Sequence, residues 1–180
     1  ILGGVEPACR RAAAVTRNRR VGLIATAASV RSGAYQRSLR QLDPDIAVTA
    51  KACPLFVPLV ENGRFRRGDV VIETVAREYL EPLRREGLDT LILGCTHYPL
   101  LTDIIGDIMG PGVTLINTGE EAAWELKRTL RGLDLLAPEG PAGRATLCAS
   151  DQPEQFGAMA SYFLGESLTR PVQPVDIDRY

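Results

Sequence analysis

The segment Leu88–Leu93 constrains the fold of this chain more than any other. It is a nearly continuous apolar run, and Gly87 separates it from a pattern over 70–85 in which apolar residues recur every fourth position. Spacing by fours predicts an amphipathic helix with a charged exposed face. A strand without polar alternation is typical of the centre of a parallel sheet that is covered on both faces. We therefore expect a helix-covered parallel sheet built around this strand.

Strand and helix patterns alternate along the rest of the chain. Apolar periodicity predicts helices over 7–17, 32–42, 100–109 and 120–130, and strands over 20–26, 46–52 and 113–116. This alternation favours an α/β fold, an open and mostly parallel sheet with helices on both faces. A Pro- and Gly-rich stretch over 137–143 predicts a linker, and a strand over 145–149 and a helix over 153–164 follow it.

Charge and cysteine usage narrow the functional classes. The chain has 21 basic and 22 acidic residues spread along its length and a formal charge of −1, so we expect no nucleic-acid partner. Its apolar runs are far shorter than the roughly twenty residues of a spanning helix, so we expect no membrane partner. The four cysteines show no C-x-x-C spacing, which favours neither a metal site nor a disulfide scaffold. A reducing cytoplasm is the expected location.

Polar residues follow three of the predicted strands, at 26–29, 95–97 and 117–119. In open parallel sheets ligands bind outside the carboxyl ends of the strands, so we expect these segments to line one crevice. Cys95 stands between a buried strand and a helix start, where backbone amides favour the thiolate and lower a thiol pKa from about 8.5. Taken singly, a cysteine is more often a buried apolar residue and a histidine a structural one.

The neighbours of Cys95 favour a chemical role. His97, the only histidine of the chain, is placed to exchange protons near the sulfur. Thr96 adds a hydroxyl and a backbone N–H where turn amides bind a substrate carboxylate. A reactive thiol with a titratable neighbour at the end of a strand is typical of an active site.

The segment from Gly94 to Leu101, GCTHYPLL, resembles the signature around the second catalytic cysteine of glutamate racemases. Segments 5–8, 21–35 and 52–61 also resemble parts of that family, in the same order. The resemblance spans nearly the whole chain, and an ordered set of segments is more specific than a single motif.

The resemblance implies a cofactor-independent enzyme that interconverts L- and D-glutamate for peptidoglycan synthesis, with no metal. Two cysteines on opposite faces of the α-carbon exchange its proton, so one sulfur is a thiolate while the other is protonated. Cys95 is then one acid/base group, with His97 assisting it. The implied substrate contacts are Thr96, His97, Thr26 and Ser29. Glu61 is expected to orient the substrate ammonium, and an exposed loop carboxylate is the equally weighted alternative.

The resemblance also implies a pseudo-symmetric pair of α/β domains. We expect residues 1–120 to form the second domain and 121–180 to return to the first, which is largely absent from this chain. The family motif Ala-Cys-Asn-Thr, which supplies the other cysteine, does not occur here, and Cys9, Cys53 and Cys148 do not replace it. We expect a piece of a longer gene product, and a homodimer is a further hypothesis.

Three rival interpretations stay open. The first is a cysteine hydrolase or amidotransferase in which His97 is the base for Cys95, although the two-residue spacing and the lack of an orienting Asp or second His count against it. The second is an aspartate or hydantoin racemase of the same superfamily. The third is a catalytically inert fragment, either regulatory or oligomerising.

Overall fold

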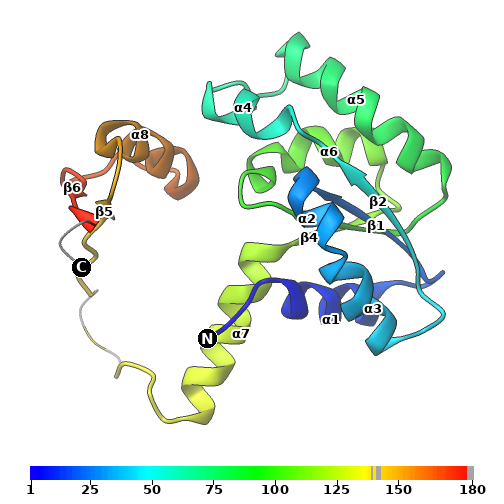
Figure 1. The fold of residues 1–180 in the computed structure, drawn as a ribbon, viewed down its shortest axis with the longest axis horizontal. Helices are drawn as coiled ribbons and strands as arrows, with labels where there is room; N and C mark the ends of the chain where they lie inside the picture. Colours follow the sequence, from blue (N-terminus) through cyan, green and yellow to red (C-terminus); the bar gives the residue numbers. More distant parts are fainter. Residues whose placement is uncertain (139, 141–142, 178–180) are drawn as a thin grey trace. The chain divides into compact units, whose positions relative to one another are not determined.

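The first of two compact units is built on a parallel sheet. The computed structural model describes residues 1–138, 140 and 143–177, and the chain divides into Ile1–Leu136 and Ala137–Tyr180. The strands of the first unit are β1 (Arg20–Ala25), β2 (Ala47–Ala52), β3 (Thr90–Gly94) and β4 (Thr114–Asn117). Their order is β2-β1-β3-β4, and every neighbouring pair is parallel (Figure 1). The predicted α/β class is confirmed.

Helices cover both faces of this sheet. In Figure 1, α1 (Val5–Val15), α3 (Ala34–Leu42) and α7 (Thr118–Gly132) lie below it, and α4 (Phe56–Glu61), α5 (Val70–Arg85) and α6 (Thr102–Met109) lie above it. Because both faces are covered, the central strand β3 is buried from Thr90 to Leu93. Among the described residues no helix is long and apolar enough to span a membrane.

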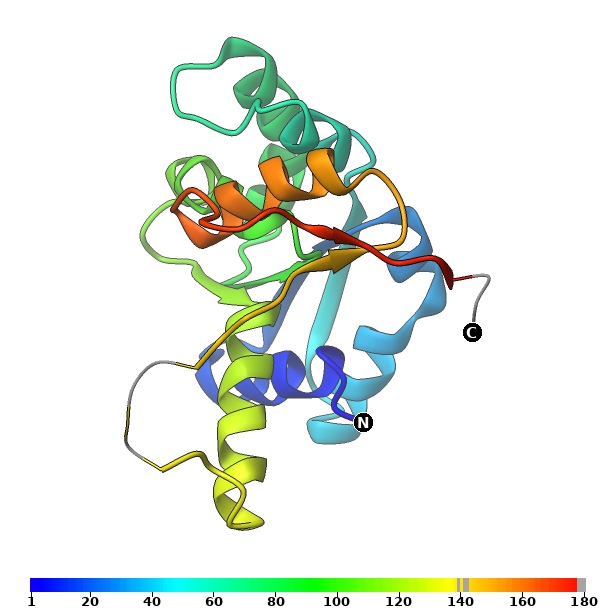
Figure 2. The same cartoon turned by 90° about the vertical axis from the view of Figure 1, so that its left-hand side faces the viewer.

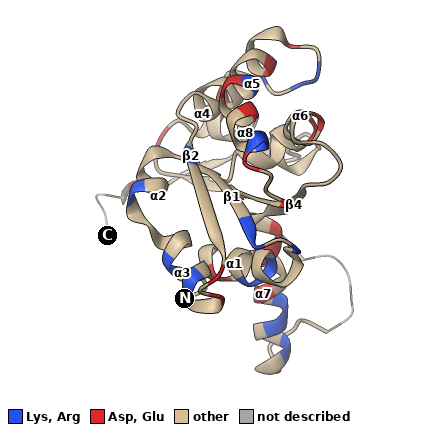
Figure 3. Ribbon diagram, turned by 90° about the vertical axis from the view of Figure 1, so that its right-hand side faces the viewer, with Lys and Arg blue, Asp and Glu red and all other residues tan. Residues whose placement is uncertain are grey.

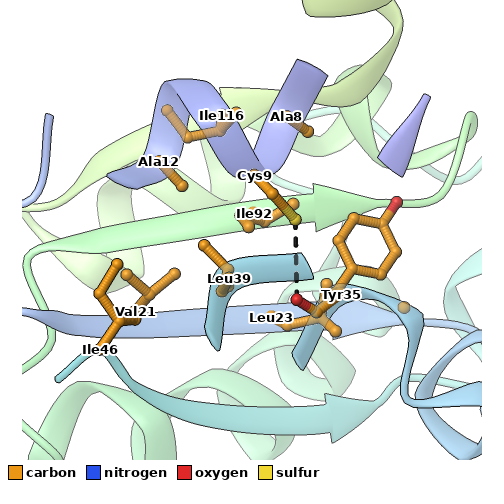
Figure 4. Packing of buried hydrophobic residues seen from close by; sticks show 11 residues of the cluster. Ala8, Cys9, Ala12, Val21, Leu23, Tyr35, Leu39, Ile46, Ile92 and Ile116 are labelled. Carbon is orange, nitrogen blue, oxygen red and sulfur yellow. Dashed lines mark hydrogen bonds between the residues drawn. The ribbon is translucent and has the colours of Figure 1, made fainter. Parts of the chain in front are cut away.

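Small side chains of α1 set the packing on one face. Ala8, Cys9 and Ala12 are fully buried and meet a cluster that includes Leu23 of β1 and Ile92 of β3 (Figure 4). Side chains this short let the helix lie close to the sheet, which gives dense packing of apolar atoms. The Cys9 thiol donates to the carbonyl oxygen of Tyr35 at 3.7 Å. Cys9 therefore belongs to the surface on which α1 packs against the sheet.

Two short helices have no counterpart among the predicted elements. The pattern over 32–42 predicts one helix, but α2 (Ala27–Ser32) precedes α3, and Gly33 separates them with φ +65°. Only glycine adopts that left-handed conformation without strain, so the chain changes direction there. The second unpredicted helix, α4, carries Pro58 in its first turn, where no intrahelical N–H is required.

A buried carboxylate joins the amino ends of the sheet. Asp89, before β3, accepts hydrogen bonds from the Thr16 hydroxyl (2.7 Å) and from the N–H groups of Arg17 (2.7 Å) and Asn18 (2.9 Å). The Thr90 hydroxyl donates to it as well, at 2.9 Å. Burial alone would raise the pKa of Asp89, but these hydrogen bonds outweigh it and lower the pKa. The charged carboxylate therefore stabilises the α1–β1 turn.

Asp89→Asn is expected to lower the free energy of unfolding by about 2–3 kcal/mol. The amide carries no charge, and its NH₂ group is a donor that would face the N–H and O–H donors which now bind the carboxylate. The same change at the exposed Asp107, which pairs with Arg67 at 2.8 Å, should cost less than about 1 kcal/mol. The native pKa of Asp89 is lowered, so its contribution is present above the unfolded-state pKa and disappears as pH falls through the native value. Denaturant titrations at pH 7 and pH 3 check both points, and equal losses for the two variants would contradict the assignment.

The second unit is small. It contains α8 (Pro153–Leu164) and two short parallel strands, β5 (Cys148–Ala149) and β6 (Gln173–Pro174), drawn side by side in Figure 2. The predicted helix over 153–164 is confirmed, whereas the strand over 145–149 is shorter than expected because only two residues pair. Of the linker predicted over 137–143, residues 139 and 141–142 lie outside the described part of the chain.

The division between the units falls after Leu136, not near residue 120. The reason is that α7 packs along α1. Charged residues lie on both helices (Figure 3), and some of them form ion pairs across the contact. Arg10 binds Glu125 at 2.9 Å, and Arg11 lies 3.7 Å from Glu121. These contacts make α7 part of the first unit. The return of the later residues to a first domain stays a prediction.

Candidate active site

The carboxyl ends of β1, β3 and β4 lie in one row at one edge of the sheet. Ala25 is paired with Gly94, and Leu93 is paired with Asn117. Each polar segment named from the sequence therefore begins at the same edge of the sheet. That the three segments line one crevice stays a prediction. Thr26 and Cys95 therefore directly follow neighbouring strands, although they are far apart in the sequence.

Gly94 sets the position of Cys95. A Cβ atom at Gly94 would lie 2.8 Å from the Leu23 side chain and 3.0 Å from the Ile24 carbonyl oxygen. Since that space is closed, only glycine lets β3 approach β1 so closely at this point. Cys95 directly follows the strand and lies in the turn before a 3₁₀ helix, η1 (Tyr98–Leu101). Cys95 is unpaired and half-buried, so its thiol is not enclosed in the core.

The Cys95 thiol is less acidic than the sequence predicts. Burial raises its pKa, and the Glu61 carboxylate raises it further, while the N–H groups of His97 and Thr96 and the Thr96 hydroxyl lower it by less. The expected acidification is wrong because the loss of hydration outweighs the few amides of one 3₁₀ turn. A raised pKa favours the protonated thiol, which is the form that donates a proton.

The His97 ring connects the thiol to a carboxylate. Its Nδ1 lies 3.8 Å from the Cys95 sulfur and 3.4 Å from the Thr96 hydroxyl, and its Nε2 lies 3.2 Å from Glu61 Oε1. Glu61 is the last residue of α4, far from His97 in the sequence. The imidazole lies between the thiol and the carboxylate, so a proton can pass from one to the other through the ring. The two contacts also fix the orientation of the ring.

The Glu61 contact changes one argument made from the sequence. The lack of an orienting Asp or second His counted against a cysteine hydrolase, but Glu61 supplies an acid of that kind. The resemblance had placed Glu61 in the site as a partner of the substrate ammonium, but it did not predict contact with His97, which depends on how α4 lies against the turn after β3. The geometry of these three residues therefore does not separate a hydrolase from a racemase, whereas membership of a protein family does.

Thr26 and Ser29 bind each other at the end of β1. Thr26 caps α2: its hydroxyl oxygen accepts from the Ser29 N–H at 3.3 Å, and the same hydroxyl bonds to the Ser29 hydroxyl at 3.1 Å. Both side chains are half-buried and Thr96 is exposed. Their role in binding a substrate stays a prediction.

The third strand end is used for capping. The Asn117 side chain accepts from the N–H groups of Gly119 (3.0 Å) and Glu120 (3.3 Å), which starts α7. The Thr118 hydroxyl donates to the Leu93 carbonyl oxygen at 3.0 Å. This segment therefore supports the edge of the sheet beside Cys95.

The other cysteines differ from Cys95 in their surroundings. Cys53 is fully buried, and burial raises its pKa to about 12. Cys148 is exposed and belongs to the second unit. Over residues 1–138, 140 and 143–177, no group of three His, Cys, Asp or Glu side chains is arranged to hold a metal ion.

One family of known proteins matches most of the chain. A sequence profile described as Asp/Glu/Hydantoin racemase matches residues 1–126. The chain belongs to this family. The glutamate racemase of Geobacter metallireducens is 45% identical over 168 residues, which cover 93% of this chain and 62% of that relative.

Solved structures of glutamate racemases share the fold. Isoform RacE1 from Bacillus anthracis has a TM-score of 0.88 at 34% identity, over 98% of this chain and 64% of that one. The enzyme from Francisella tularensis, solved in complex with D-glutamate, has a TM-score of 0.86 at 28% identity, over 99% and 65%. The chain thus spans less than two thirds of the length of these relatives.

Proposed function

We propose that the full-length protein containing this chain interconverts L- and D-glutamate without a cofactor, with Cys95 as one of two acid/base groups. The observation that carries the proposal is a half-buried thiol at the end of a central strand, within reach of His97, in a chain 45% identical to a glutamate racemase. The Francisella tularensis relative was solved with D-glutamate, which supports glutamate as the substrate.

The geometry suits proton transfer at a carbon atom. A neutral Cys95 thiol donates its proton to one face of the carbanion, and His97 with Glu61 moves a proton to or from the resulting thiolate. In the proposed reaction the opposite face is served by a second cysteine in the part of the protein outside this chain. The Thr96 N–H and hydroxyl are suited to hold the substrate carboxylate, where negative charge develops.

The cellular role follows from the substrate. We propose that the D-glutamate supplies peptidoglycan synthesis, and that the protein works in the cytoplasm, which the four unpaired cysteines support. A homodimer stays a prediction that sedimentation of the full-length protein would test.

Deuterium exchange tests the activity directly. The full-length protein is incubated in D₂O with L-glutamate, D-glutamate, each aspartate enantiomer or a substituted hydantoin, and label at the α-carbon is measured by NMR. A parallel incubation with L-glutamine is assayed for released ammonia. The proposal expects exchange and inversion of both glutamate enantiomers. Exchange confined to aspartate or hydantoin would indicate an aspartate or hydantoin racemase. Release of ammonia from glutamine would indicate a hydrolase or amidotransferase. No reaction with any of these compounds would indicate a catalytically inert protein.

A further inference from the structure

The contact between His97 and Glu61 joins two separate elements. His97 lies in the turn after β3, and Glu61 lies at the end of α4. The two side chains are 22% and 43% exposed. Ion pairs that are this open to water contribute little to holding elements together. A buried contact must therefore keep α4 at the distance where Nε2 meets the carboxylate.

Tyr98 provides such a contact. It directly follows His97, its side chain is fully buried, and its hydroxyl donates to the Cys53 carbonyl oxygen at 3.1 Å. The same oxygen accepts from the Phe56 N–H at 3.3 Å, at the start of α4. The Cys53 N–H in turn donates to the Ala25 carbonyl oxygen of β1 at 3.0 Å. Tyr98 thus ties the turn that carries His97 to the segment from which α4 begins.

The rings make a second tie between the same two elements. Phe56 is fully buried, and its ring meets the Tyr98 ring edge-on, with 5.2 Å between centroids and 90° between planes. The Tyr79 ring of α5 packs on Phe56 at 5.3 Å. Edge-to-face pairs of this kind are favourable beyond the burial of their area. Burial also raises the pKa of Tyr98, so its hydroxyl stays a neutral donor over the working range of pH.

We propose that Tyr98 is a positioning residue: its hydrogen bond to Cys53 and its ring contact with Phe56 hold His97 against Glu61. This role rests on the proposed racemase function and acts on the same site. The Tyr98 hydroxyl is bonded to the Cys53 carbonyl oxygen, so it is assigned no direct part in proton transfer. Its effect on the reaction passes through the His97–Glu61 contact, so it should vanish when Glu61 is removed.

A double-mutant cycle in the full-length protein tests that dependence. Tyr98→Phe and Glu61→Gln are each expected to lower kcat for glutamate racemisation about 10-fold, with KM changed less than about 2-fold. The double variant should fall no more than about 3-fold below Glu61→Gln. Independent losses that multiply to about 100-fold would overturn the proposal, since Tyr98 would then act without Glu61.

Alkylation of Cys95 gives a readout that does not need activity. The fraction of Cys95 alkylated by iodoacetamide is measured against pH by mass spectrometry of its peptide. The groups that shift the pKa of this thiol are His97, Thr96 and Glu61. Tyr35 and Tyr98 also lie near it, because a charged Cys95 raises the pKa of each of them. Glu61→Gln removes a carboxylate that raises the Cys95 pKa, so the midpoint should move to lower pH.

Tyr98→Phe should move the alkylation midpoint in the same direction as Glu61→Gln. It removes no charge, because the hydroxyl is neutral, so any shift must come from displacement of Glu61 or His97. A midpoint unchanged from the parent protein would overturn the proposal even if kcat falls. A protein that fails to exchange glutamate but shows the shift would contradict the racemase function and support the positioning role.

Two further variants separate positioning from general stability. Tyr79→Phe removes a hydroxyl from the same ring cluster but leaves the Tyr98–Cys53 hydrogen bond in place, so its effect on kcat should multiply with that of Glu61→Gln and the midpoint should not move. Phe56→Leu breaks the ring contact while keeping an apolar side chain. Phe56→Leu should shift the alkylation midpoint toward that of Glu61→Gln. If Tyr98→Phe does not fold, an alkylation midpoint of Phe56→Leu equal to that of the parent protein overturns the proposal.

Discussion

Cys95→Ser in the full-length protein is expected to lower kcat for glutamate racemisation by about 10³-fold or more, while the protein still folds. A positioned acid/base group contributes about 10²–10⁴-fold to such a rate, and a hydroxyl is far less acidic than a thiol. The raised pKa of Cys95 favours the protonated thiol as the donor. A serine hydroxyl gives up its proton far less readily, and the alkoxide that would have to take a proton back is much less stable than a thiolate. Steady-state racemisation and the rate of α-deuterium exchange measure the loss.

Cys148→Ser is the matched control for this prediction, because it makes the same change at an exposed thiol in the second unit. It should leave kcat unchanged. The unfolding free energy of Cys95→Ser should stay within about 1 kcal/mol of the parent, since the side chain is half-buried and its neighbouring N–H groups can bind a hydroxyl. A Cys95→Ser protein with near-normal turnover would remove Cys95 from the reaction.

Local patterns revealed the parts of the fold that depend on near neighbours in the chain. Helices cover both faces of the strand at 90–94, so nearly all of its residues are apolar, and this run can be recognised in the sequence. Cys95 and His97 are also neighbours in sequence, so their shared place at the strand end could be inferred once the strand was recognised.

Contacts between segments that are distant in the chain produce no local pattern that could be recognised in the sequence. Glu61 reaches His97 only because α4 lies beside the turn after β3, and α4 itself was missed. The strand β6 has two residues and depends on its pairing with β5, so no periodicity could predict it.

The acidity of Cys95 shows a different limit. A turn before a helix suggested a lowered pKa, but the direction depends on how much water the fold removes from the sulfur and on where Glu61 lies. Both quantities belong to the tertiary structure. Sequence alone identified the residue but gave the wrong sign for its pKa.

His97→Asn in the full-length protein is expected to lower kcat about 10²-fold with KM changed less than about 3-fold. In the proposed mechanism the ring passes a proton between Cys95 and Glu61, with which it is in contact, rather than binding substrate strongly. Asn places a polar atom near the position of Nδ1 and His97→Gln places one near Nε2, but neither side chain titrates at working pH. If proton transfer is the role, both variants lose kcat to a similar degree and the pH–rate profile changes shape in both. If one variant keeps full activity with an unchanged profile, then a hydrogen bond at that nitrogen is all that the site requires, and the imidazole is structural.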